Sequence, residues 1–117
     1  MRLVAVCAVL VLGPGAAAAD AYDGLYRPDA PWAQGWDCRS VGMDGGALAV
    51  MNGTFYGVEN KCALTNPVPV RGMAATLYDG QCAGEGVTYS ERIMLMRSAN
   101  GIVVIRDGYA SALIRCP

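Results

Sequence analysis

Three glutamates are the side chains of this sequence that could do acid–base chemistry. Glu59 and Glu85 each lie three residues from a cysteine, and Glu91 lies inside an alternating apolar run. Two carboxyl groups a few ångströms apart can hydrolyse a glycosidic bond, so a small carboxylate-dependent hydrolase acting on glycans is one candidate function. A polar side chain beside a cysteine, however, commonly satisfies backbone N–H groups in a turn. We therefore expect Glu59 and Glu85 to have structural roles.

Glu91 is unusual because it shares the face of an expected strand with apolar residues, namely Val87, Tyr89, Ile93 and Leu95. Either its carboxylate enters the interior and pairs with an arginine such as Arg106 or Arg115, or a bulge turns it outward. We favour the ion pair over a catalytic acid, because no base or nucleophile stands nearby in the sequence.

The chain contains no histidine, which excludes Ser–His and Cys–His nucleophile pairs and imidazole zinc sites. Met94 and Met96 lie on one strand face, and thioether sulfur suits Cu(I). Because this M-x-M pair occurs once and without histidine, apolar packing is the better interpretation. We expect no metal or cofactor, and we expect a non-catalytic protein rather than an enzyme.

Four aromatic residues gather in the proline-broken segment 20–37: Tyr22, Tyr26, Trp32 and Trp36. They could form an exposed platform that binds a glycan or a protein partner, or they could plug one end of the fold. The prolines Pro28 and Pro31 stiffen the segment, which reduces the entropy lost on binding. The predicted function is therefore a binding or inhibitory module that uses these aromatic residues.

Four cysteines remain once the first 19 residues are set aside: Cys38, Cys62, Cys82 and Cys116. An even number in a small exported chain predicts two disulfides, and the wide spacing disfavours an all-thiolate zinc site. A hairpin centred on Asn52-Gly53 would bring Cys62 back toward Cys38, so this bridge is favoured and leaves Cys82 with Cys116. Pairing of Cys38 with Cys116 stays open among the three connectivities.

Residues 1–19 have the pattern of a secretory signal peptide, with an arginine at position 2, an apolar run and an alanine-rich end. The apolar run is too short to span a membrane, and no other segment approaches that length. The sequence therefore predicts a mature domain at 20–117 that is periplasmic or secreted.

The rest of the chain reads as six or seven short strands, expected at 22–26, 47–51, 54–59, 70–78, 86–97, 102–105 and 109–115. Turn signals separate them, at Asn52-Gly53, Asp79-Gly80, Asn100-Gly101 and Asp107-Gly108, with a loop at 66–69. We expect a single all-β domain, an antiparallel meander closed as a small barrel or sandwich. A net charge of −1 without a basic run argues against nucleic acid as a partner.

Three segments carry a resemblance: 56–62, 82–86 and 113–116, with the pattern G-x-E-x-x-C, C-x-x-E-G and R-C. This pattern resembles one found in an uncharacterised group of small exported bacterial proteins, and it implies a four-cysteine β domain. In general shape the chain is also similar to the cysteine-bridged β-barrels that inhibit lysozyme in the periplasm, which implies a binding role. The loop motif of those inhibitors is not evident here.

Overall fold

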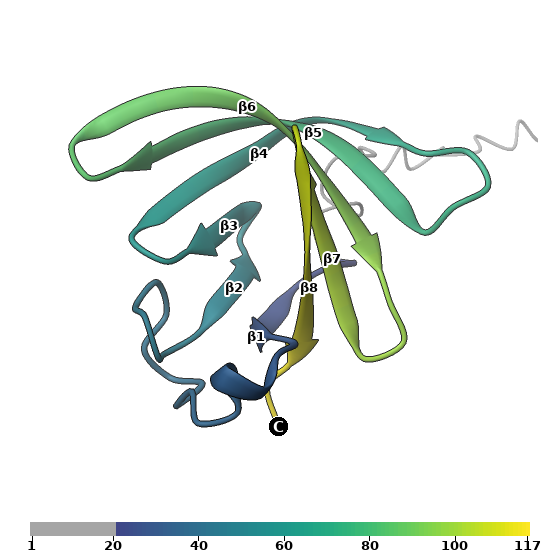
Figure 1. The fold of residues 1–117 in the computed structure, drawn as a ribbon. Coiled ribbons are helices and arrows are strands. Elements are labelled where there is room, and N and C mark those ends of the chain that lie inside the picture. The colour runs from purple at the N-terminus through teal and green to yellow at the C-terminus, as the bar shows by residue number, and fades with distance from the viewer. Residues whose placement is uncertain (1–20) are drawn as a thin grey trace, which may run out of the picture.

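The computed structural model describes residues 21–117, which form a closed antiparallel barrel of eight strands (Figure 1). The strands are β1 (Gly24–Pro28), β2 (Leu48–Met51), β3 (Thr54–Gly57), β4 (Asn60–Pro69), β5 (Ala75–Gly84), β6 (Val87–Arg97), β7 (Gly101–Arg106) and β8 (Tyr109–Arg115). Each strand pairs with the next, and β8 pairs with β1 to close the barrel. The predicted all-β class is confirmed, with one strand more than expected. The expected signal peptide lies outside the described residues.

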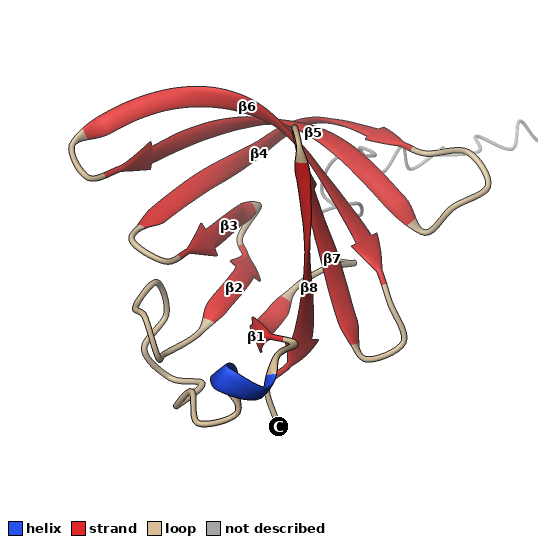
Figure 2. Cartoon of the chain, in the orientation of Figure 1, coloured by secondary structure: helices blue, strands red, loops and turns tan. Residues whose placement is uncertain are grey.

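One short 3-10 helix, η1 (Pro31–Ala33), follows β1 and is the single helical element of the described chain (Figure 2). Within residues 21–117, no helix has the length and apolar character needed to cross a membrane.

The turn between β2 and β3 follows the local sequence signal. Asn52 and Gly53 both have positive φ, at 52° and 70°, which is the backbone of a type I′ turn. The same backbone recurs between β5 and β6, where Glu85 and Gly86 have φ of 51° and 77°. The prediction of a hairpin at Asn52-Gly53 is confirmed.

The predicted strand order is wrong at β4, because the prolines of this strand led us to expect a loop. The segment 66–69, expected to be a loop, is the end of β4, and Asp79-Gly80, expected to be a turn, lies inside β5. Proline has no N–H to donate, so strands tolerate it at edges and bulges. Here β3 pairs with β4 only as far as Ala63, and the β4–β5 register shifts after Thr65.

Two disulfides are present, but the favoured pairing is wrong: Cys38 bonds to Cys116, and Cys62 bonds to Cys82. The reason is the missed strand, because β4 places Cys62 directly opposite Cys82 of β5. Their Cα atoms are 4.0 Å apart, as in a pair of residues that exchange no backbone hydrogen bonds. The connectivity that had stayed open, Cys38 with Cys116, is the one observed.

Tyrosines fill the end of the barrel where β1 begins. Tyr22 and Tyr26 are buried; the Tyr22 hydroxyl shares a 2.9 Å hydrogen bond with Thr76 Oγ1, and the Tyr26 hydroxyl donates to the Tyr22 carbonyl. Tyr78 is buried close to them, and burial raises the pKa of its phenol to about 12. This tyrosine end of the barrel is therefore closed by side chains.

At the opposite end the barrel wall is uneven. β6 pairs with β5 from Val87 to Met96, but it pairs with β7 only from Met94 to Arg97. The β5–β6 hairpin therefore projects beyond the β7–β8 turn, as the ribbon shows (Figure 1). The inner face of this projecting hairpin stands beside the open end.

Candidate functional site: the open end of the barrel

A cavity of about 390 Å³ occupies the end of the barrel opposite the tyrosines. This volume lies within the usual range of about 300–1,000 Å³ for ligand pockets. Its lining includes Pro28, Trp32, Leu48, Phe55, Val58, Asn60, Val104, Arg106, Tyr109, Ser111 and Leu113. The strands contribute most of the apolar residues of the lining, the β3–β4 turn contributes Val58, and η1 contributes Trp32. We call this cavity the mouth.

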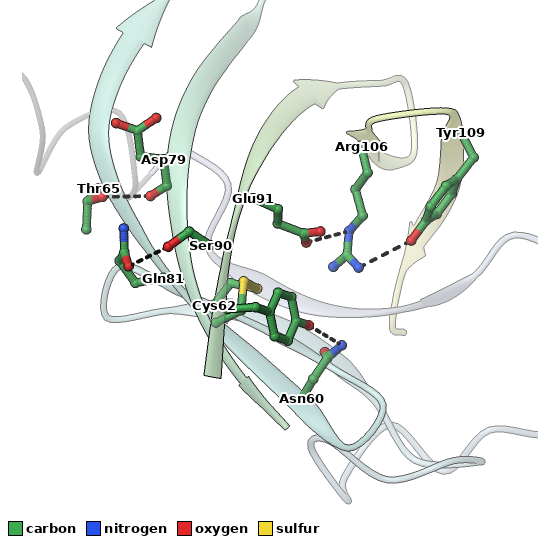
Figure 3. The surroundings of a disulfide bond; sticks show 11 residues. Asn60, Cys62, Thr65, Asp79, Gln81, Ser90, Glu91, Arg106 and Tyr109 are labelled. Carbon is green, nitrogen blue, oxygen red and sulfur yellow. Dashed lines mark hydrogen bonds and ion pairs between the residues drawn. A yellow bond between two sulfur atoms is a disulfide. The ribbon is translucent and has the colours of Figure 1, made fainter. Parts of the chain in front are cut away.

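Arg106, at the end of β7, lines the mouth together with a second charged residue, Asp29. Three side chains contact the Arg106 guanidinium, and Figure 3 shows two of them, Glu91 and Tyr109. Its Nε lies 3.4 Å from Glu91 Oε1, its Nη1 donates to the Tyr109 hydroxyl at 3.3 Å, and its Cζ lies 5.5 Å from the centroid of the Phe55 ring. The Arg106 side chain is 15% exposed and that of Glu91 28%. Because a guanidinium has five N–H groups, these contacts leave donors for a ligand oxygen.

The predicted partnership of Glu91 with Arg106 is thus confirmed. Arg115, the other arginine considered, lies at the tyrosine end, where its Cζ is 5.3 Å from the Tyr26 ring centroid and its Nη1 donates to the Asp23 carbonyl. The alternation of β6 places Glu91 on the inner face, and β7 ends where Arg106 can reach it.

Two buried acceptor atoms beside the mouth have no hydrogen-bond donor among the described residues: Asn60 Oδ1 and Glu91 Oε1. Asn60 uses its amide nitrogen to donate to the Tyr89 hydroxyl at 3.4 Å, while Glu91 has only the ion pair described above. Buried polar atoms are normally hydrogen-bonded, but neither of these two atoms has exposed surface that a ligand could contact. The donors and acceptors that the mouth offers are therefore the other polar side chains of its lining: Asp29, Arg106, Tyr109 and Ser111.

Exposed apolar side chains surround the mouth. Trp32 is 70% exposed and Tyr109 is 56% exposed, and Val58, Val87 and Tyr89 are also exposed. Val58 lines both the mouth and a neighbouring hollow that Val87 and Tyr89 line, so the apolar surface continues from one to the other. Exposed apolar patches of this kind mark interaction sites.

The four aromatic residues predicted to bind do not form one surface. Tyr22 and Tyr26 are buried at the tyrosine end: Tyr26 faces inward from β1, and Tyr22, which precedes this strand, shares a hydrogen bond with Thr76. Trp36 is half-buried against the core, and only Trp32 stands exposed at the mouth. The two tryptophan rings meet edge to face with centroids 6.2 Å apart. The prediction of an exposed binding platform is therefore wrong for Tyr22 and Tyr26. Their burial agrees with the alternative, in which they plug one end of the fold.

Glu59 and Glu85 lie on neighbouring turns, one between β3 and β4 and the other between β5 and β6, and both line a hollow of about 360 Å³. Both have left-handed φ, at 57° and 51°, and both are exposed. Their side chains make no hydrogen bond or ion pair within residues 21–117, so the expected capping of turn N–H groups is not observed. Glu91 does not line this hollow.

One cluster of potential metal ligands occurs among residues 21–117, formed by the Cys62 and Cys82 sulfurs and the Glu91 carboxylate within 4.8 Å of one another. Metals bind cysteine as the thiolate, and these sulfurs are joined in a disulfide. Met94 and Met96 are half-buried on the outer face of β6, away from this cluster's inner face. The disulfide-bonded cluster is therefore not a metal site.

Sequence reasoning missed Phe55, Asn60, Arg106 and Tyr109 as a group. The turn signal at Asp107-Gly108 did place Arg106 and Tyr109 side by side. Comparison with models of known families, with curated proteins and with solved structures yields no match, so the candidate site rests on the geometry of the mouth alone.

Proposed function

We propose that this protein is a non-catalytic binding module that takes a saccharide unit of a glycan into its mouth. The observation that carries the proposal is the combination of exposed Trp32 and Tyr109 with a fixed Arg106 at an open apolar cavity. A sugar ring has an apolar face that can stack on an aromatic ring, and its hydroxyl groups both donate and accept.

The polar atoms of the mouth support a hydroxylated ligand over an ionic one. Arg106 is paired with Glu91, and Asp29 also lines the mouth, so the mouth carries no excess of positive charge. The Asp29 carboxylate accepts hydrogen bonds, the Arg106 guanidinium donates them, and the Tyr109 and Ser111 hydroxyls do both. A ligand hydroxyl group can both donate and accept, whereas a carboxylate or phosphate cannot donate and would bring negative charge beside Asp29 and Glu91.

The glycan hydrolase has less support than binding. Glu91 is engaged with Arg106, and Glu59 and Glu85 line a different hollow as exposed turn residues. The site of action we infer is the periplasm or the extracellular space, because two disulfides in so small a domain suit an oxidising compartment.

Titration of the protein with a panel of soluble oligosaccharides, followed by calorimetry and tryptophan fluorescence, tests this proposal. Trp32→Ala should weaken binding by at least about 2 kcal/mol, roughly 30-fold, with the fold intact because the side chain is exposed. Met73→Ala is the matched control, since Met73 is exposed on the β4–β5 turn and absent from the mouth. Glu85→Gln should leave affinity unchanged.

The proposal fails if no oligosaccharide binds, or if Trp32→Ala and Met73→Ala weaken binding equally. Release of shorter sugars from a bound oligosaccharide, lost in Glu91→Gln or Glu85→Gln, would favour the hydrolase instead. If the protein instead binds a protein partner and Trp32→Ala abolishes that binding, the mouth remains the binding site but its ligand is a protein rather than a glycan.

A further inference from the structure

The projecting half of β6 is a sheet edge. β5 pairs with β6 along its whole length, yet within residues 21–117 no strand pairs with the other side of β6 before Met94. In the ribbon this half of β6 runs along the outer boundary of the molecule (Figure 1). Residues 87–90 and Arg92 are exposed, and a hollow of about 510 Å³ lies between the strand at 90–92 and the β7–β8 turn at Asp107. The edge is therefore open to an incoming strand.

The register identifies the backbone groups that face outward at this edge. The two-residue turn at Glu85-Gly86 makes Gly84 and Val87 the first hydrogen-bonded pair of the β5–β6 hairpin. Hydrogen-bonded and non-hydrogen-bonded pairs alternate along an antiparallel ladder. Tyr89 and Glu91 therefore point their N–H and C=O groups at β5, whereas Thr88, Ser90 and Arg92 point theirs at the open side.

We propose that a second copy of this chain occupies the edge, with the two β6 strands antiparallel about a two-fold axis at Ser90. In this register Ser90 lies opposite the partner's Ser90, and Thr88 lies opposite the partner's Arg92. Each of the three edge residues then exchanges both of its backbone hydrogen bonds. An isologous contact of this kind closes as a dimer and leaves no further edge of the same type.

The side chains of the strand suit this register. Pairing about Ser90 sets Glu91 opposite the partner's Tyr89 and Arg92 opposite the partner's Thr88, so no like charges face each other. Moving the axis to Arg92 would oppose two arginines, and moving it to Thr88 would run the pairing into the turn. The edge contains no proline and no bulge, two of the devices that block strand addition, and the charges of Glu91 and Arg92 lie opposite uncharged residues in this register.

This contact is separate from sugar binding, because it uses the backbone edge and the mouth opens on the inner face. The inner faces of both copies lie on the same side of the joined sheet, since a two-fold axis perpendicular to a sheet preserves its faces. Loss of the dimer and loss of glycan binding are therefore independently measurable.

Sedimentation velocity and amide hydrogen exchange of the unmodified chain, from micromolar to millimolar concentration, test the proposal without any variant. The sedimenting species should move toward twice the monomer mass, and the amides of Thr88, Ser90 and Arg92 should become protected as it does. Those of Tyr89 and Glu91 should be protected at every concentration. A monomer throughout, or edge amides that exchange freely at the highest concentration, overturns the proposal.

Cysteine cross-linking tests the register. Ser90→Cys should form a disulfide-linked dimer under mild oxidation, because hydrogen-bonded pairs hold Cα atoms about 5.5 Å apart, within disulfide range. Thr88→Cys is the matched control: its sulfur would lie about 13 Å from its counterpart, at roughly 3.3 Å per residue over four residues. Peptide mapping confirms that the native bridges stay intact. Equal cross-linking of both variants contradicts the Ser90 axis.

Discussion

Tyr78 should make the barrel sensitive to alkaline pH in a way that one substitution removes. Its side chain is 1% exposed, and its hydroxyl oxygen has no aligned hydrogen-bond partner among the described residues. Burial raises the pKa of this phenol from 10.0 to about 12. The unfolded chain therefore ionises Tyr78 at a lower pH than the folded chain does.

The sign and size of the effect follow from this difference. Below the unfolded pKa of 10.0 both states keep the proton, and Tyr78 adds no pH dependence. Above it the unfolded state binds fewer protons, so the free energy of unfolding falls as the pH rises. The loss from Tyr78 is about 1.4 kcal/mol at pH 11 and approaches roughly 2.7 kcal/mol above pH 12, at 1.36 kcal/mol per pKa unit.

Tyr78→Phe is the test, because it removes the ionisable group and leaves the aromatic ring in place. At neutral pH the stability of the variant should lie within about 1 kcal/mol of the parent, because the buried hydroxyl has only its contact with the Thr76 side chain to lose. Urea unfolding followed by circular dichroism from pH 8 to pH 11 gives both curves. Other tyrosines, including Tyr26 with its raised pKa, affect both chains alike. Curves that stay a constant distance apart up to pH 11 would refute the reasoning.

Two further predictions concern the mouth and the loop before β2. A double-mutant cycle with Glu91→Gln and Arg106→Met should give a coupling free energy of about 1 kcal/mol, more than a fully exposed pair and less than a fully buried one; zero coupling would show that the two residues do not fix each other. Asp37 accepts hydrogen bonds from the Ser40 and Arg39 backbone N–H groups and the Ser40 hydroxyl, which lower the pKa of its carboxyl below 3.8. Its stabilisation is present above pH 3.8 and lost as the pH falls below that value, so acid unfolding curves of Asp37→Asn should be shallower there, and identical curves would count against the role.

Local signals in the sequence were enough to predict some of these features. Asn52-Gly53 requires positive φ at both positions, and the turn forms there. The alternation along 86–97 placed Glu91 on the inner face, and the cost of leaving a carboxylate unpaired favoured an arginine partner, with Arg106 and Arg115 both open; the structure shows Arg106. Each of these inferences needs only neighbouring residues.

Features that depend on barrel closure could not be predicted in this way. The end of β4 looks like a loop because proline is tolerated only where one side of a strand is free, and that depends on where β3 stops. The missed strand then gave the wrong partners for Cys62. Likewise, Phe55 and Arg106 meet because the sheet curls until β8 pairs with β1, and neither spacing nor alternation specifies that curl.

The bridge between Cys38 and Cys116 turns strands β2 to β8 into one covalent ring. A protease that cuts a single turn inside this ring therefore releases no fragment, and the Cys62–Cys82 bond still joins β4 to β5. If the β1–β8 pairing opened after such a cut, its three residue pairs would re-form within one molecule, because all the strands stay covalently joined. The turns around the mouth could accordingly be nicked, or lengthened by insertion, while the strands that support them stay attached.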